Sequence, residues 1–239
     1  MSVEGDDLLD RAVTCVGLPA GIVAWTTTRA AGSFALTSDE PVDAVMNRWG
    51  ALGDALSLRG ISRLASATQV HGADIVRHGG GWRGWLRGRG VDGHISSAPG
   101  TALAVTVADC TPVFIAHPSG AIAALHAGWR GTAARILHVG LDAMAELGCP
   151  ADECTVHLGP SICGRCYEVG PEVFESIFGV RPATKGLLDV RAVLAEQARG
   201  RGVGELTVSE LCTRCHPSQL FSHRGGDSGR QLGIIARLA

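Results

Sequence analysis

Apolar runs and alternating apolar and polar positions divide the chain into short strand-like segments. Alternation of β-branched residues over 21–29 is typical of a half-buried strand. The nearly unbroken apolar runs over 103–108, 113–117 and 121–125 are typical of strands covered on both faces. The remaining expected strands cover 64–70, 74–77, 154–158, 205–209 and 232–238. The pattern therefore predicts a sheet-rich protein with fully buried central strands.

Two longer segments carry apolar residues at every third or fourth position, which predicts amphipathic helices. The first begins after Ser38-Asp39-Glu40-Pro41, and the second opens at Gly131-Thr132 and ends at Gly148. The apolar residues of the first helix are expected to pack in the core of the protein. They are Val42, Val45, Met46, Trp49, Leu52 and Leu56. The corresponding apolar residues of the second helix are Ile136, Leu137, Leu141, Met144 and Leu147.

Shorter helices are expected near 171–178 and 189–199, so strands and helices alternate along the chain. No internal repeat or long linker interrupts this order. We therefore expect residues 1–20 to form an N-terminal extension and residues 21–239 to form one α/β domain.

Composition and charge narrow the classes of protein. With 46% hydrophobic and 18% charged residues, the 239-residue chain can bury a substantial core, and a net charge of −2 argues against a domain-wide nucleic-acid footprint. The acidic start lacks an apolar signal core, and no apolar run approaches the roughly 18 residues of a membrane span. We expect a cytoplasmic protein without nucleic-acid or membrane partners.

One segment departs from the alternating pattern. Residues 78–90 (HGGGWRGWLRGRG) contain six glycines, three arginines and two tryptophans. This composition predicts a flexible basic loop, either a solvated insertion or an element that gates a site or steers anions.

Three residues at the ends of predicted strands are candidates for chemistry. His71 closes one apolar strand, Cys110 closes another, and His126 ends a third. Thiolate and imidazole are ligands that zinc prefers, and three protein ligands leave a fourth position open. The spacings of 39 and 16 residues match no local metal motif. A metal site, a Cys–His catalytic dyad and structural packing all remain open from these residues alone.

Two further stretches are candidates for anion binding. Gly128-Trp129-Arg130-Gly131-Thr132 precedes a helix, where backbone N–H groups and Arg130 suit a phosphate. Near the C-terminus, Ser222-His223-Arg224 and Arg230 form a polar, basic cluster that suits an anionic or ribose-binding pocket. For both stretches, an ordinary surface role is the alternative.

Four of the eight cysteines form two Cys-x-x-Cys pairs, Cys163/Cys166 and Cys212/Cys215. Such pairs suit structural zinc, although the gap between them exceeds that of a usual zinc ribbon. The H-x-E element of zinc-dependent nucleobase deaminases is absent from the sequence, which argues against that fold.

Several motifs together resemble a known family. QVHGADIV, ADCTPVFIAHPSGAIAALHAGWRGTAARIL, LGPSICGRCYEVG and CTRC…LFSHRGGDSGRQ occur in the order seen in the bacterial YfiH-like family, also called the laccase-domain or polyphenol-oxidase family. The resemblance runs from about residue 21 to the C-terminus. It implies mixed β-sheets flanked by helices, with a core similar to that of the cytotoxic necrotizing factor deamidases.

The resemblance also implies a site and an activity. It implies that His71, Cys110 and His126 bind one Zn²⁺ or Cu²⁺, while it assigns no metal to the Cys-x-x-Cys pairs. The implied reactions are phosphorolysis of adenosine, inosine and S-methyl-5′-thioadenosine, and deamination of adenosine. Purine nucleosides and inorganic phosphate would then be the partners of a monomer or homodimer. We expect Asp109 to shuttle protons, and Arg130 with the Gly131 and Thr132 amides to hold phosphate. Further phosphate contacts are expected from Arg29, His223, Arg224 and Arg230.

The chain departs from the family pattern at several points. Thr28-Arg29 is followed by Ala30-Ala31-Gly32 instead of two glycines, the expected Asn-Leu-Gly segment is missing, and Gly225 replaces a second arginine. These changes affect the expected substrate and phosphate contacts but not the ligand set.

Three rival functions follow from the same residues. The first is a copper polyphenol oxidase, but none of the nine histidines forms the His-x-His pair of a multicopper laccase. The second is a metal-free hydrolase or deamidase with Cys110 as nucleophile and His126 as base. The third is a structural metal module that contacts its partners through residues 78–90.

Overall fold

The computed structural model describes residues 8–239, and its strands form two large mixed sheets. Residues 1–7 of the expected N-terminal extension, including most of the acidic start, lie outside the described residues. In the order of their hydrogen-bonded neighbours, one sheet contains β1 (Val13–Thr14), β2 (Ile22–Thr26), β14 (Gln231–Arg237), β7 (Thr101–Val107), β3 (Arg63–Thr68) and β5 (Gly84–Arg89). The other contains β13 (Glu205–Val208), β10 (Thr155–Leu158), β8 (Thr111–Ala116), β9 (Ile122–Ala127), β6 (Gly93–Ser96) and β4 (Ile75–His78).

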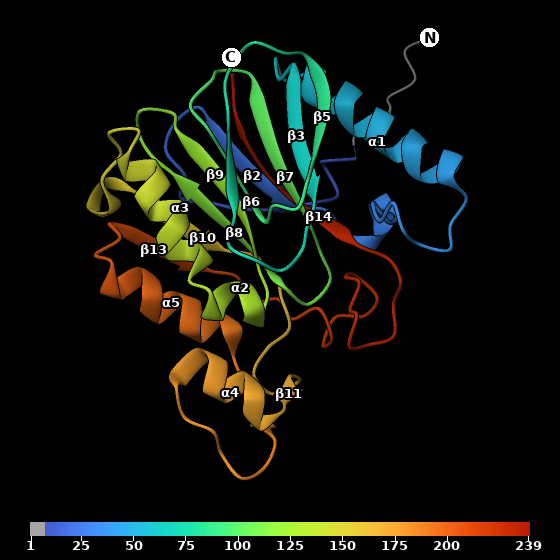
Figure 1. Cartoon of the computed structure of the whole chain (residues 1–239). Coiled ribbons are helices and arrows are strands. Elements are labelled where there is room, and N and C mark those ends of the chain that lie inside the picture. The colour runs from blue at the N-terminus through green and yellow to red at the C-terminus, as the bar shows by residue number, and fades with distance from the viewer. Residues whose placement is uncertain (1–7) are drawn as a thin grey trace.

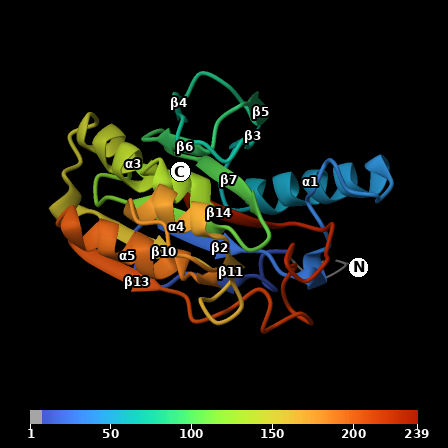
Figure 2. The same cartoon turned by 60° about the horizontal axis from the view of Figure 1, so that its bottom comes forward.

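Helices cover the outer faces of both sheets (Figure 1). Helix α1 (Val42–Ser57) packs on the first sheet, and α2 (Trp129–Ala133), α3 (Ile136–Ala145) and α5 (Val190–Gly200) lie beside the second. The remaining elements are α4 (Pro171–Phe178), a small hairpin of β11 (Glu168–Val169) and β12 (Gly186–Leu187), and the 3₁₀ turns η1 (Arg29–Ala31) and η2 (Ala151–Glu153). Figure 2 shows α4 and α5 on the side turned toward the viewer. This arrangement confirms the expected α/β class with mixed sheets flanked by helices.

The inner faces of the two sheets pack against each other. Leu103, Phe114, Ile122 and Ile235 belong to one buried apolar cluster with residues from both sheets. The unbroken apolar runs read from the sequence thus correspond to central strands covered on both faces, where only apolar side chains avoid the cost of desolvation.

Residues 78–90 do not form the expected flexible loop. Most of their second half is strand β5, which pairs in parallel with β3, so that Arg63 stands opposite Gly84 and Thr68 opposite Arg89. The strand lies at the edge of its sheet with Leu86 43% exposed. An edge strand needs backbone pairing on one side only and little apolar burial, which explains why glycine and arginine are tolerated there.

Two helix predictions also need correction. The single helix expected from Gly131 is two helices, α2 from Trp129 and α3 from Ile136, because Arg135 between them adopts a left-handed conformation with φ 59°. In α1, Trp49 and Leu52 are buried as expected, but Val42 and Met46 are 70% and 44% exposed. Val45, in the same turns of the helix, is buried, so the helix buries a narrower stripe than the spacing predicts.

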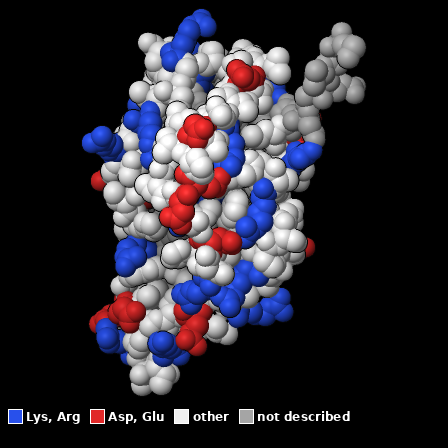
Figure 3. All heavy atoms as spheres, turned by 90° about the vertical axis from the view of Figure 1, so that its right-hand side faces the viewer, with Lys and Arg blue, Asp and Glu red and all other residues white. Residues whose placement is uncertain are grey.

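The described residues contain no helix long and apolar enough to cross a membrane. On the face shown in Figure 3, acidic and basic side chains are interspersed, in keeping with the small net charge of the chain.

Candidate metal centre and its cavity

Three loop and strand positions from both sheets converge on one point. His71 follows β3, Cys110 lies between β7 and β8, and His126 is in β9. One potential ligand atom from each lies within 4.8 Å of the other two, and the two imidazole centroids are 4.7 Å apart. The fold therefore brings together residues that are 39 and 16 positions apart.

A buried aspartate that the sequence analysis missed holds this cluster in place. Asp92 is fully buried, and its Oδ1 accepts a hydrogen bond from Nδ1 of His126 at 2.8 Å. The same carboxylate accepts backbone N–H bonds from Val70, His71 and Gly72 at 3.1, 2.9 and 2.7 Å. These bonds hold His71 at φ 62°, a backbone conformation that non-glycine residues seldom adopt. Asp92 thus orients two of the three candidate ligands.

The environment makes Cys110 and His126 a charged pair. Burial alone would raise the pKa of Cys110, but the charge of His126 and hydrogen bonds from His126 and His71 outweigh it and lower the pKa to about 6. Burial would lower the pKa of His126, yet Cys110 and Asp92 together raise it to about 9. A thiolate is the form of cysteine that binds metals and attacks electrophiles.

Gly128 leaves the space that Cys110 occupies. A Cβ atom at position 128 would lie 2.8 Å from Sγ of Cys110 and 3.4 Å from Cδ2 of His71. Since the backbone conformation at Gly128 is ordinary, with φ −83°, the close approach of the thiol is what requires glycine.

The candidate ligands border a cavity of about 620 Å³. Apolar side chains of Phe34, Leu36, Ile162 and Val190 form part of its wall, with the ring of Tyr167 beside them. The volume lies within the range of small-molecule sites, which span roughly 300–1,000 Å³.

Four arginines also line the cavity: Arg87, Arg130, Arg224 and Arg230. Arg130 lies 4.4 Å from the Trp129 ring centroid, and Arg224 lies 4.9 Å from that of Tyr167. His223 is on the same wall. Arg87 was not identified individually from the sequence, because it belongs to the segment expected to be a loop.

The remaining residues expected at the phosphate site lie elsewhere. Gly131 and Thr132 are buried and do not line the cavity, and the Thr132 amide already donates to the Gly128 carbonyl. Arg29 forms an ion pair with Asp227 and stacks on Phe221, outside the cavity lining.

Asp109 lines the cavity, but both of its carboxylate oxygens are engaged. Oδ1 accepts hydrogen bonds from Thr213 Oγ1 and Ser222 Oγ at 2.6 and 2.7 Å, and Oδ2 accepts one from the Arg224 amide at 2.6 Å. The side chain therefore ties the 211–216 and 222–224 segments to the strand end that carries Cys110.

The donor set fits a metal ion. Two imidazoles and a thiolate suit zinc, and copper binds such ligands as well. The hydrogen bond from Nδ1 to Asp92 leaves Nε2 of His126 as its metal-binding nitrogen, an arrangement typical of metal-bound histidine. His71 is exposed at the cavity, so the ion would be accessible to a substrate.

Fold and site together define a mixed α/β protein with a two-histidine, one-cysteine candidate metal centre beside a basic cavity. The chain belongs to the family described as multi-copper polyphenol oxidoreductase laccase, whose model matches residues 27–238. The family resemblance read from the sequence motifs is thereby confirmed.

Named relatives and solved structures agree with this assignment. A purine nucleoside phosphorylase of Streptomyces griseus is 32% identical over 80% of this chain and 86% of its own length. An adenosine deaminase of an unknown prokaryotic organism is 36% identical over 62% of this chain and 63% of its own length. The structure of YlmD from Geobacillus stearothermophilus matches with a TM-score of 0.87 and 30% identity, covering 95% of this chain and 96% of that one.

Proposed function

We propose that this protein is a metal-dependent purine nucleoside phosphorylase with adenosine deaminase activity. The observation that carries the proposal is one cavity that holds both the His71, Cys110 and His126 donor set and four arginines. The names of the relatives, phosphorylase and deaminase, support the same reactions. The substrates would be adenosine, inosine and S-methyl-5′-thioadenosine.

Phosphorolysis needs an anion fixed beside the sugar. An oxygen of hydrogen phosphate forms a bond to C1′ of the ribose while the bond from C1′ to the purine nitrogen breaks. The purine takes up the proton that the hydrogen phosphate gives up. Arg87, Arg130, Arg224 and Arg230 would hold the phosphate through charge-assisted hydrogen bonds, with His223 beside them. The Gly131 and Thr132 amides and Arg29 have no part in this version of the phosphate site, because they do not line the cavity.

The apolar part of the wall would receive the purine. Phe34, Leu36 and Ile162 offer a surface on which a flat base can pack, and Tyr167 adds an aromatic ring. Burial of the base there would exclude water from the reacting bond.

His71, Cys110 and His126 would hold one Zn²⁺ or Cu²⁺, which when bound supplies a Lewis acid at the edge of the cavity. Asp92 would fix the two imidazoles in their binding orientation. For Asp109 we replace the expected proton shuttle by a positioning role, because its oxygens already accept three hydrogen bonds.

The proposal is tested by assaying adenosine and inosine with and without phosphate, and by measuring bound metal, for wild type and Cys110→Ala. We expect phosphate-dependent release of hypoxanthine from inosine in the wild type, and loss of both activity and active-site metal in the variant. A variant that keeps the same metal content as the wild type and its phosphorolysis would show that the three-residue site is wrong.

A multicopper oxidase centre is not supported by the ligands. Among residues 8–239, clusters of three or more potential ligands comprise only the His71 set and the four cysteines of the Cys-x-x-Cys pairs. A laccase-type set would need many more histidines in contact.

One observation favours a second candidate, a metal-free Cys–His hydrolase or deamidase. Cys110, His126 and Asp92 form a chain of hydrogen bonds in which the carboxylate orients the imidazole and the imidazole stabilises the thiolate. Full activity of the chelated protein on amide substrates, lost in Cys110→Ala, would support this candidate over phosphorolysis.

A further inference from the structure

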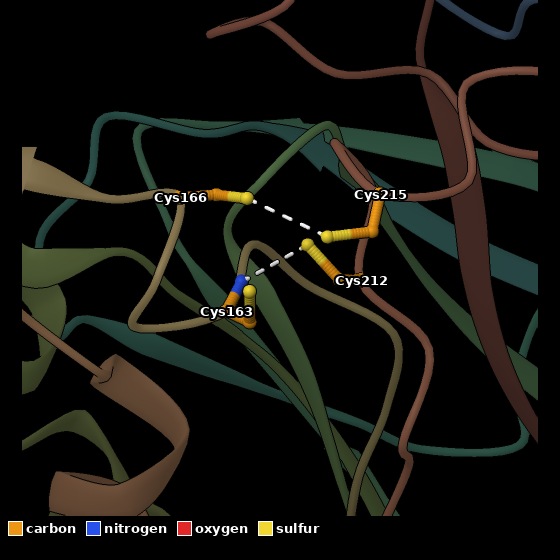
Figure 4. Close-up of side chains that lie close together, drawn as sticks. All are labelled: Cys163, Cys166, Cys212 and Cys215. Carbon is orange, nitrogen blue, oxygen red and sulfur yellow. Dashed lines mark hydrogen bonds between the residues drawn. The ribbon is translucent and has the colours of Figure 1, made fainter.

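The two Cys-x-x-Cys pairs meet in space, although 45 residues separate them in the sequence. Figure 4 shows Cys163 and Cys166 on one loop facing Cys212 and Cys215 on another. All four sulfur atoms lie within 4.8 Å of one another, and Sγ of Cys166 is 3.5 Å from Sγ of Cys215. The fold therefore gathers four thiols around a single point.

These distances suit a tetrahedral metal ion. Zinc–sulfur bonds of about 2.3 Å place neighbouring sulfurs of a tetrahedral site about 3.8 Å apart. The sulfurs of two separate disulfides would instead lie about 2.05 Å apart within each pair. A single ion requires all four thiols to lie close to one another, as they do here, whereas two disulfides do not.

Backbone hydrogen bonds hold both Cys-x-x-Cys loops around the cluster. The Cys163 amide donates to Sγ of Cys212 at 3.2 Å, which stabilises a thiolate. The first loop closes with a hydrogen bond from the Cys166 amide to the Cys163 carbonyl at 2.9 Å. The second closes with a bond from the His216 amide to the Cys212 carbonyl at 3.1 Å.

Charge in the two loops favours the same occupant. Each pair encloses an arginine, Arg165 in the first and Arg214 in the second. Four thiolates and one Zn²⁺ carry a net charge of −2, so a cationic residue between the cysteines of each pair is compatible with such an ion. None of the four cysteines lines the cavity of the candidate active site.

The cluster is linked to that site through Asp109. The Ile162 amide, next to Cys163, donates to the Asp109 carbonyl at 3.1 Å. Thr213, next to Cys212, donates to the Asp109 carboxylate at 2.6 Å. Both loops thus contact the residue before Cys110, which has a left-handed backbone with φ 81°.

We propose that Cys163, Cys166, Cys212 and Cys215 bind one structural Zn²⁺ as four thiolates. The ion joins the two loops and holds Asp109, and with it the strand end that carries Cys110. This site is separate from the ion proposed for His71, Cys110 and His126, so the intact protein binds two metal ions with different roles.

The test uses Cys110→Ala, which removes the thiolate of the active site and leaves the cluster intact. The variant is purified under reducing conditions, its zinc is counted, and its zinc X-ray absorption is recorded. We expect one zinc per chain with four sulfur neighbours. A zinc-free variant, or one whose zinc has nitrogen neighbours, overturns the proposal, as does a protein mass that shows two disulfides under those conditions.

Cys212→Ser in the wild-type background gives the complementary result, with Cys15→Ser as the matched control because Cys15 lies outside both clusters. We expect Cys212→Ser to lose the four-sulfur zinc and Cys15→Ser to keep it. If Cys212→Ser does not fold, chelation of Cys110→Ala provides the second readout. Removal of zinc should then accelerate hydrogen exchange at the Ile162 and Thr213 amides, and unchanged exchange would contradict the structural role.

Discussion

Two clusters of potential metal ligands lie on either side of Asp109, and they differ in their ligand atoms and in the segments that supply them. His71, Cys110 and His126 come from three distant segments, mix nitrogen and sulfur, and border a cavity. The four cysteines come from two short loops, offer sulfur only, and lie outside the cavity lining. Catalytic zinc sites keep an open position, whereas structural sites are closed by four protein ligands. The mixed group at the cavity is thus suited to reaction, and the all-sulfur group away from it is suited to a structural role.

The largest expected effect is on phosphorolysis, and it distinguishes the two clusters of potential ligands. Cys110→Ala should reduce phosphorolysis by more than about a hundredfold, because loss of a ligand should exceed the roughly 10–100-fold cost of losing an outer partner. The free energy of unfolding should change little by comparison. Steady-state assays with inosine and phosphate, together with denaturant titrations, measure both.

Cys212→Ser should show the opposite balance, with a lower free energy of unfolding and a smaller loss of activity. Equal losses of activity in the two variants would contradict different roles for the two clusters, since both would then act in the reaction.

Asp92→Asn should have the next largest effect. The amide can no longer accept all the hydrogen bonds from His126 and the 70–72 backbone, so the imidazoles lose their orientation. We expect metal affinity at the active site, measured by competition with a chelator, to fall about 10–100-fold. Zinc at the four cysteines should be unaffected. Wild-type affinity in this variant would show that Asp92 does not support the ligands.

Gly128→Ala should have a moderate effect on activity. The added methyl group would lie 2.8 Å from Sγ of Cys110, so the thiol must move. Since a displacement of about 1 Å in an active site can cost about a hundredfold in rate, we expect a loss of tenfold or more in kcat. Gly53→Ala is the matched control, because nothing lies near its added atom in helix α1. Similar kcat values for the two variants would contradict a need for glycine at position 128 to leave room for the Cys110 thiol.

The smallest expected effect is the contribution of His94 to the free energy of unfolding at acidic pH. Burial and the charge of His78 lower the pKa of His94, in β6, to about 3. The unfolded state binds this proton more readily, so the contribution to stability is present above about pH 6.5 and declines as the pH falls toward 3. The slope for one such group is at most about 1.4 kcal/mol per pH unit.

Denaturant titrations between pH 4 and pH 8 measure this slope, and His94→Gln should make it shallower. Parallel stability profiles for the variant and wild type would contradict a buried, neutral His94.

Much of the fold could be predicted from the sequence because the central strands are covered on both faces. The runs that became β7, β8 and β9 must be apolar, so their positions are visible without a structure. Strand β5 was missed because an edge strand needs little burial, and β6 because Ile95 is its one strongly apolar residue, so it forms no apolar run. The break between α2 and α3 at Arg135 could not be predicted, because it does not change the spacing of the apolar residues.

The candidate site was only partly visible. His71, Cys110 and His126 stand at the ends of recognisable strands, and family motifs surround them. Asp92 had no such signal, because its role depends on backbone amides that only the folded chain brings within reach. The spacing of the cysteine pairs suggested zinc, but only the fold shows that the two pairs meet.

The most direct test of the central claim is the product formed from inosine and phosphate by protein stripped of metal and then supplied with zinc. Phosphorus NMR distinguishes ribose 1-phosphate from unreacted phosphate. We predict ribose 1-phosphate in equal amount to hypoxanthine, formed by the zinc-supplied protein and not by the stripped protein. Hypoxanthine without ribose 1-phosphate, or equal rates with and without metal, would contradict a metal-dependent phosphorylase.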